Sequence, residues 1–320
     1  MVKNKKADAR VWIVVLLIII ILLLGVIVFF VLGKNRPLAN NQNNPLNNQQ
    51  DNQTEGMEGK GSYFLCATSY DSLTWTKCDK PVSTLANSPG ALFDGTNKFV
   101  YFFRREGVFA MISDNSNNWI EKNVTLSGLK KGIKAEDPDV VLLDNGKYRM
   151  YYYEYPLGSG NSAERQGNFT IGSAISDDGL NFVVEPGTRT EFEKIMDPDV
   201  IKMGNVWRMH ASQIYPNRNL GKIVSFVSHD NGMSFQFENF IELEEADTGV
   251  SGTIKVPGGY RMYYNVEIEE APFRNINSAF STDGENWIKD EGVRVKGAAN
   301  LAVLKDNEKY WLIYTAKAPQ

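Results

Sequence analysis

The sequence predicts an all-β fold: a five-bladed β-propeller closed by its N- and C-terminal hairpins and preceded by one transmembrane helix. One turn motif recurs five times, aromatic-rich hairpins separate the copies, and an uncharged apolar segment lies near the N-terminus. The 14 Tyr, 17 Phe and 6 Trp also favour strands, because aromatic side chains fit a pleated, half-buried surface.

The N-terminal apolar segment spans residues 11–32, 22 residues with no charge and only one glycine. It is long enough to cross a bilayer, whereas a signal-peptide core is shorter and precedes a small-residue cleavage site. Four basic residues precede it and two follow it, so we expect residues 1–10 to be cytoplasmic and the rest to be outside. This pattern predicts a single-pass membrane protein.

Residues 33–60 form a predicted disordered linker. Positions 40–53 hold seven Asn and four Gln, a composition that cannot bury enough apolar surface to fold. Residues 61–320 remain for one large all-β domain. The net charge of −4 becomes −9 without the first 36 residues, which carry six basic groups and one acidic group. Nucleic acid is therefore not an expected partner.

The recurring turn has the consensus Ser-x-Asp-Gly-x-x-aromatic. Its copies are SYDSLTW (69–75), SDNSNNW (113–119), SDDGLNF (176–182), SHDNGMSF (228–235) and STDGENW (281–287). Their serines are 44, 63, 52 and 53 residues apart, a usual length for a four-stranded blade. The Asp side chain can satisfy local backbone groups and Gly accepts a positive φ, so we interpret the motif as a structural hairpin turn.

Five inner hairpins lie between these turns, starting at Ser88, Asp137, Asp197, Asp247 and Gly297. The chain begins with an outer hairpin (62–78) and ends with an inner one (299–317). We expect the two halves to combine into one blade, because ring closure removes exposed sheet edges.

Cys66 and Cys78 lie three residues outside Ser69 and Trp75, so they should face each other across the first hairpin. Outside the cell a disulfide is expected here, and it would add about 3 kcal/mol. The alternative is two buried free thiols.

Charged residues gather at one predicted face of the propeller, where the inner strands begin and the second strands connect to the third. They include Asp137, Asp139, Asp197, Asp199, Glu244 and Glu245 at strand starts, and Arg105, Glu154, Gln213 and Tyr215 in the connections. The opposite face receives plain turns such as Asp144-Asn145-Gly146. Any function should therefore lie at the charged face.

Asp-Pro before a β-branched run, a Gly turn and an aromatic strand resembles the five-bladed propeller glycoside hydrolases. These include the arabinanases and xylosidases of family 43 and the invertase and levansucrase families. The recurring turn resembles the Asp box of sialidases. The resemblance covers about 61–317 and implies a hydrolase of poly- or oligosaccharides that uses clustered carboxyls.

Carried over residue by residue, the resemblance implies a catalytic set of Asp137, Asp197 and Glu245, with Glu244 as the alternative third acid. Substrate contacts are expected from Glu154, His210, Arg105, Gln213 and Tyr215. Two places depart from the family: Ser88-Pro89 stands where a base Asp is usual, and Gly297-Ala298-Ala299 carries no acid. Glu270-Ala271-Pro272 matches a family acid motif, but in a connection.

Structural roles are the alternatives for several of these residues. Asp139 and Asp199 are expected to accept backbone hydrogen bonds. Arg149, Arg208 and Arg261 recur at one point of the second strand, which indicates blade architecture. His210 aligns with Tyr151 and Tyr263, so it is either a core residue or a channel residue. No cofactor is expected. A structural Ca²⁺ in the central channel is an open alternative, but the sequence shows no set of ligands for it.

The leading hypothesis is a membrane-anchored glycosidase facing outward. The alternatives are a non-catalytic glycan-binding or adhesive propeller and a structural module of a cell-envelope assembly. Catalysis requires at least two carboxyls within about 10 Å of each other on the pocket floor.

Overall fold

The computed structural model describes residues 62–84, 88–104, 107–114, 118–156, 168–214, 221–243, 248–267 and 274–317. The chain divides into two compact units, 1–50 and 51–320, and all described residues belong to the second. The predicted cytoplasmic segment, transmembrane helix and linker (1–60) lie outside the described residues. No helix within the described ranges is long and apolar enough to cross a membrane.

Every regular element of the described residues is a β-strand, and the strands form consecutive antiparallel meanders. The first strands are β3 (Gly90–Phe93), β7 (Ile133–Leu142), β12 (Ile195–Met203), β16 (Thr248–Val256) and β20 (Val295–Lys305). The second strands are β4 (Lys98–Arg104), β8 (Tyr148–Pro156), β13 (Val206–Ile214), β17 (Gly259–Val266) and β21 (Tyr310–Lys317).

The third and outermost strands complete each meander. The third strands are β5 (Gly107–Ser113), β9 (Asn168–Ser176), β14 (Gly221–Ser228), β18 (Arg274–Ser281) and β1 (Ser62–Ser69). The outermost strands are β6 (Trp119–Ser127), β10 (Asn181–Val184), β15 (Gln236–Ile241), β19 (Ile288–Lys289) and β2 (Thr76–Lys77), and the short β11 (Thr190–Glu193) pairs with β9. Brief pairings such as β6 with β10 join neighbouring meanders into larger sheets.

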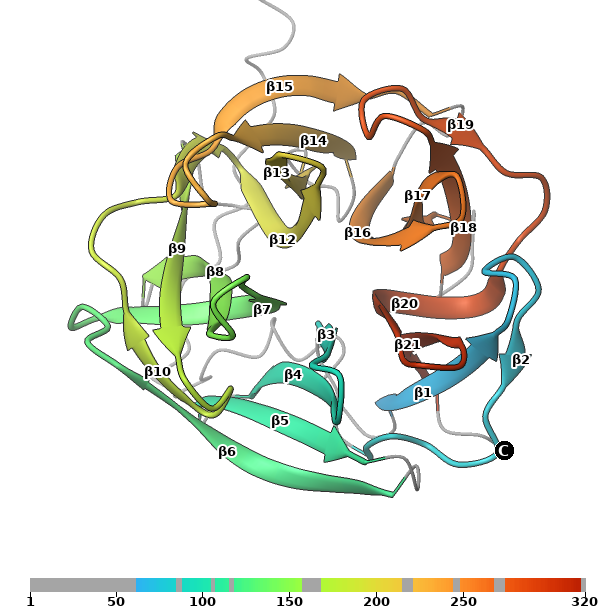
Figure 1. The fold of residues 1–320 in the computed structure, drawn as a ribbon, viewed down its shortest axis with the longest axis horizontal. Helices are drawn as coiled ribbons and strands as arrows, with labels where there is room; N and C mark the ends of the chain where they lie inside the picture. The colour runs from blue at the N-terminus through green and yellow to red at the C-terminus, as the bar shows by residue number, and fades with distance from the viewer. Residues whose placement is uncertain are drawn as a thin grey trace, which may run out of the picture. The chain divides into compact units, whose positions relative to one another are not determined.

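The first strands surround a common centre (Figure 1). Each contacts the next in the order β3, β7, β12, β16 and β20, and β20 contacts β3 again. The hydrophobic clusters lie between neighbouring meanders. We call the packed region between two neighbouring meanders a joint. The middle residues of the second strands are therefore buried on both faces, which explains their runs of apolar and aromatic residues. This all-β arrangement is consistent with a β-propeller.

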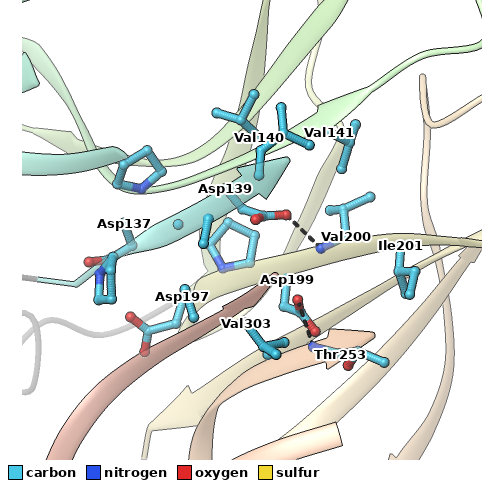
Figure 2. A pocket seen from close by; sticks show the side chains of 18 of the residues that line it. Asp137, Asp139, Val140, Val141, Asp197, Asp199, Val200, Ile201, Thr253 and Val303 are labelled. Atoms are coloured by element: carbon cyan, nitrogen blue, oxygen red, sulfur yellow. Dashed lines mark hydrogen bonds between the residues drawn. The ribbon is translucent and has the colours of Figure 1, made fainter. Parts of the chain in front are cut away.

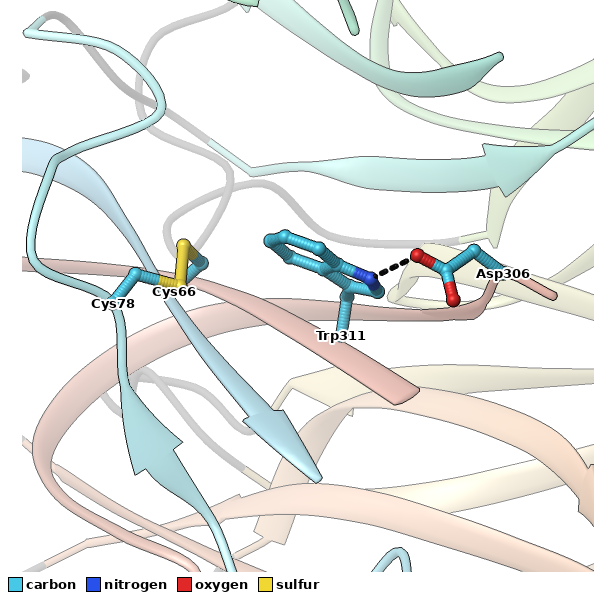
Figure 3. Close-up of a disulfide and its surroundings, with 4 residues drawn as sticks. All are labelled: Cys66, Cys78, Asp306 and Trp311. Atoms are coloured by element: carbon cyan, nitrogen blue, oxygen red, sulfur yellow. Dashed lines mark hydrogen bonds between the residues drawn. A yellow bond between two sulfur atoms is a disulfide. The ribbon is translucent and has the colours of Figure 1, made fainter. Parts of the chain in front are cut away.

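The two ends of the described chain meet in one meander, as the sequence predicted. Strand β1 pairs with β21 along its whole length, from Ser62 opposite Lys317 to Ser69 opposite Tyr310. Its outer neighbour β2 has only two residues. A disulfide joins Cys66 to Cys78 beside this short strand, with the two Cα atoms 5.3 Å apart (Figure 3). The covalent bond thus holds the outer edge where the backbone ladder is short.

The recurring turn is held by its aspartate. In the copy at 176–182, Asp178 accepts the Ser176 hydroxyl at 2.9 Å and the backbone N–H groups of Leu180 and Asn181 at 2.8 Å. Gly179 has a φ of 73°, the left-handed region that the turn requires. Asp71, Asp230 and Asp283 repeat the pattern, while positions 115–117 of the second copy lie outside the described residues. The turn is structural, as predicted.

Arginines of the second strands cross the joints. Arg149 binds Glu185 at 2.7 Å within its own meander and donates to the Asn231 carbonyl of the next meander's turn at 2.7 Å. Arg208 does the same with Glu238 and the Asp283 carbonyl, and Arg261 with Asp290 and Ser72. The recurrence of this arginine is therefore a feature of the fold, as the sequence analysis expected.

Candidate functional site

A β-bulge near the start of the first strands turns the Asp-Pro-Asp segments inward. On β7 the pairing shifts between Glu136 and Asp139, and on β12 between Met196 and Asp199. The first aspartate of each segment is left-handed, with φ of 51° at Asp137 and 53° at Asp197. Asp and Asn adopt this conformation more readily than other non-glycine residues, and a bulge re-aims the side chain that it carries.

The registers align two layers of residues around the centre. The outer tier, at the bulge, consists of Ser88, Asp137, Asp197, Val250 and Asn300. The inner tier, two residues further along each strand, consists of Gly90, Asp139, Asp199, Gly252 and Ala302. Only two positions of each tier carry a carboxyl group.

A cavity of about 320 Å³ runs along the first strands. Ser88, Asp137 and Asp197 line it at one end, which we call the mouth, and Lys202 and Lys255 line it near the other end. Figure 2 shows Asp137 and Asp197 next to each other, with Asp139 and Asp199 further along the same strands. The predicted acidic entrance is thus part of a central cavity.

Asp137 and Asp197 form a hydrogen-bonded carboxyl pair. Burial raises the pKa of Asp197 well above its usual range, and the charge of Asp137 and the hydrogen bond to it raise it further, against a hydrogen bond from Ser212. Burial also raises the pKa of Asp137, while hydrogen bonds from Ser88 and Asp197 lower it. Both pKa values are therefore raised, which favours a protonated carboxyl in this pair.

The inner tier has a different role. Asp139 accepts the Val200 N–H at 2.8 Å, and Asp199 accepts the Thr253 N–H at 3.1 Å (Figure 2). Each carboxyl thereby ties its own first strand to the next one. Burial and the charge of Asp199 raise the pKa of Asp139 well above its usual range. The structural role expected for these two residues agrees with these contacts.

His210 is fully buried behind the cavity wall. Its Nδ1 lies 2.9 Å from Thr253 Oγ1 and 3.4 Å from Asp199 Oδ2, and both of these residues line the cavity. Its ring packs edge-on against Trp287, as Tyr151 packs against Phe235 one joint earlier. His210 thus occupies the aromatic position of the joint, and it is not one of the lining residues.

The other predicted site residues are scattered. Glu154 is half-buried at the mouth end of β8, and Gln213 donates to the Glu193 carbonyl at 3.2 Å. Glu245, Arg105 and Tyr215 lie outside the described residues, so their roles stay predictions. The structure therefore brings together Asp137 and Asp197 of the predicted catalytic set.

Three residues near the mouth were not predicted as site residues. Ser88 was noted only as a departure, yet it hydrogen-bonds Asp137, and Ser212 hydrogen-bonds Asp197. Arg274 is half-buried; burial lowers its pKa, while the charges of Glu267 and Asp197 raise it. Register relative to the bulge could have found the two serines, whereas Arg274 has no motif.

The described residues supply no metal cage. No group of three or more His, Cys, Asp or Glu side chains within them is placed to hold a metal ion. The carboxyls of the inner tier are engaged by backbone N–H groups.

Solved structures of glycoside hydrolases match the chain at low sequence identity. A thermostable family-43 glycoside hydrolase is 15% identical, with 73% of this chain and 94% of that chain covered at a TM-score of 0.53. The α-L-arabinanase of Cellvibrio cellulosa, solved with arabinohexaose, is 11% identical, with 72% and 86% covered at a TM-score of 0.56. A family-32 β-fructofuranosidase of Bombyx mori is 12% identical, with 71% and 54% covered at a TM-score of 0.54.

No family model and no curated protein sequence matches the chain. The chain has the fold of the propeller glycoside hydrolases of families 43 and 32. At this level of identity the likeness is one of fold, and the chemistry must be argued from the mouth itself.

Proposed function

We propose that this chain is a membrane-anchored, extracytoplasmic glycoside hydrolase that acts on a poly- or oligosaccharide. The observation that carries the proposal is the proton-sharing Asp137–Asp197 pair at the mouth of the cavity. The fold shared with glycoside hydrolases supports it. The arabinanase solved with arabinohexaose supports a carbohydrate as the ligand class.

In this proposal the meanders are the five blades of a propeller. The closed order of the first strands and the pairing of β1 with β21 support this arrangement. Residues 11–32 anchor the protein and residues 33–60 tether the propeller outside the membrane. The Cys66–Cys78 disulfide supports an oxidising compartment, because cytosolic thiols are kept reduced.

Glycoside hydrolysis needs a protonated carboxyl for the leaving oxygen and a second carboxylate about 5–5.5 Å or 6.5–9.5 Å away. Asp137 and Asp197 are hydrogen-bonded to each other, which is too close to flank a glycosidic bond. They act instead as one unit: Asp197 is the general acid, and Asp137 accepts its proton in a hydrogen bond and positions it. The second carboxylate comes from another element of the mouth, and Glu245 is the candidate from the sequence.

A non-catalytic glycan-binding propeller is the second candidate function. The observation that favours it is the composition of the outer tier, where Ser88 and Asn300 stand in positions equivalent to Asp137 and Asp197. A tier with two carboxyls in mutual contact can hold sugar hydroxyls without cleaving a glycosidic bond.

The two functions separate in one experiment. The full-length chain, purified in a mild detergent, is assayed against a panel of aryl glycosides and oligosaccharides for both hydrolysis and binding. We expect hydrolysis that Asp197→Asn abolishes and that Glu121→Gln, a change at the outer strand β6, leaves intact. Binding of the same sugars without any turnover would reject the enzyme and establish the binding function.

A further inference from the structure

Arg274 stands apart from the other arginines of the described residues. Four others form ion pairs: Arg104 with Glu121, Arg149 with Glu185, Arg208 with Glu238 and Glu285, and Arg261 with Asp290. Arg189 and Arg294 donate to backbone carbonyls. Arg274 is half-buried and makes no hydrogen bond or ion pair with any residue that the structure describes. Its five N–H donors thus find no acceptor among the described residues.

The chain direction places Arg274 at the same end of the sheets as the mouth, although it is not one of the residues that line the cavity. Strand β16 begins there and runs inward, β17 returns antiparallel to it, and β18 starts again at the mouth with Arg274 as its first residue. The guanidinium lies within electrostatic range of Asp197, the acid of the carboxyl pair. A cation that has no hydrogen bond or ion pair with a described residue, and that feels the charges of Glu267 and Asp197, therefore stands near the carboxyl pair.

A second polar side chain near Arg274 also lacks partners. Asn265 is fully buried, and neither atom of its amide has a hydrogen-bond partner among the described residues. It lies opposite Ile276, which makes it a diagonal neighbour of Arg274 on one face of the sheet, about 7–8 Å away. At the same register position of the neighbouring meanders, Ser212 bonds Asp197 and Thr315 bonds the Ala299 carbonyl. Other buried polar atoms of the described residues also lack a partner, but Asn265 is the one that lies diagonally opposite Arg274.

We propose that Arg274 binds the carboxylate of an acidic sugar, so that the mouth accepts a glycan containing uronic acid residues. The proposal rests on the proposed function, in that the mouth must bind carbohydrate. A planar guanidinium binds a carboxylate through two parallel hydrogen bonds, a geometry that a neutral hydroxymethyl group cannot offer. The shared proton leaves the Asp137–Asp197 pair with a single negative charge, which Arg274 balances before the anionic sugar enters.

The test compares acids with their own esters. Oligogalacturonate, oligomannuronate and hyaluronan oligosaccharides, each beside its methyl ester, are titrated calorimetrically into the full-length chain in detergent. We expect at least one acid to bind about tenfold or more tightly than its ester, the effect of one charge-assisted hydrogen-bonded pair. Arg274→Gln should remove the preference, and Arg104→Gln, a paired arginine at the end of β4, should keep it.

Arg274→Lys serves as the second variant, because it keeps the charge, loses the bidentate fork and stays usable if the glutamine variant does not fold. Equal binding of acids and esters, failure of every acid to bind, or a preference that survives in the folded Arg274 variants would overturn the inference. Hydrolysis is measured on the same probes. Cleavage without an acid preference rejects the inference and keeps the enzyme, whereas acid binding without cleavage rejects the enzyme and keeps the inference.

Discussion

The joints and the mouth both contain arginines and aspartates, but the contacts of these side chains differ between the two regions. At a joint, Arg208 is 6% exposed and is held by Glu238, Glu285 and a backbone carbonyl. At the mouth, Arg274 has no partner among the described residues. A buried charge is tolerated when it is paired, so the first arrangement belongs to the fold. In the second, no described residue accepts the donors, which is why we propose a ligand for them.

The two aspartates of one Asp-Pro-Asp segment show the same difference two residues apart. Asp139 accepts a backbone N–H of the next first strand and so ties the two strands together. Asp137, turned by the bulge, meets Asp197 and Ser88 at the cavity. The difference shows that a repeated sequence can serve the fold at one position and a site at another, and that the partners distinguish the two.

The largest expected effect is at the carboxyl pair, where Asp197→Asn should lower the rate of hydrolysis by about 10²–10⁴-fold, the usual contribution of a general acid. The same variant should not lose folding stability at neutral pH. Because the folded pKa of Asp197 is raised above its ordinary 3.8, the folded state binds more protons than the unfolded chain, and stability falls as pH rises through that window. The neutral amide escapes this loss.

Urea denaturation of both proteins at several pH values checks the stability part. The variant should match or exceed the wild type at neutral pH. A variant that is inactive because it is less stable would place Asp197 among the joint residues and break the comparison.

The second effect is on folding alone. Arg208→Ala should cost about 3–5 kcal/mol of unfolding free energy, because it leaves the partly buried Glu238 without its partner. Arg274→Ala should cost clearly less, about 1 kcal/mol or below, since it removes no hydrogen bond or ion pair with a described residue. Equilibrium denaturation of the two variants side by side measures the contrast. Equal losses would mean that Arg274 is also a structural residue.

The sequence predicted the repeated parts of this molecule because their causes are local. The Ser-x-Asp turn forms from side chains two to four residues apart, and the cysteines flank one hairpin symmetrically. The joint role of Arg149, Arg208 and Arg261 followed from recurrence. The closing of the ring followed from the two half-blades at the chain ends.

The parts that the sequence did not predict depend on register and on distant partners. That Asp197 lies next to Asp137 follows from bulges whose positions are set by pairing with the second strands. That His210 fills the place of a tyrosine against Trp287 could be suspected from its alignment, but its contact with Thr253 could not. Arg274 became a candidate only because no described residue pairs with it, and no motif reports such an absence.

The disulfide sharpens the comparison at the meander in which the two chain ends meet. Removing it with Cys66→Ser and Cys78→Ser together should cost about 3 kcal/mol, because the cross-link closes a loop of sequence separation 12. Reduction of the wild type should lower its free energy of unfolding by a similar amount and so lower its unfolding midpoint. The carboxyl pair at the mouth and its activity should stay unchanged in the folded protein. An unchanged midpoint would show that the β1–β21 ladder alone closes the ring.

The smallest effect concerns a turn, where the charge is satisfied entirely by local groups. Burial alone would raise the pKa of Asp230, but hydrogen bonds from the hydroxyls of Ser234 and Ser228 and from backbone N–H groups lower it from 3.8 to about 2. The ionised side chain therefore contributes stability above pH 3.8 that is lost as pH falls toward 2. Asp230→Asn, which copies the residue found at Asn115, should reduce the thermal midpoint slightly at pH 6. The gap from the wild type should close in acid. A gap that stays constant down to pH 2 would mean that the turn needs the shape of the side chain and not its charge. The turns would then differ from the joints, where charged groups are paired.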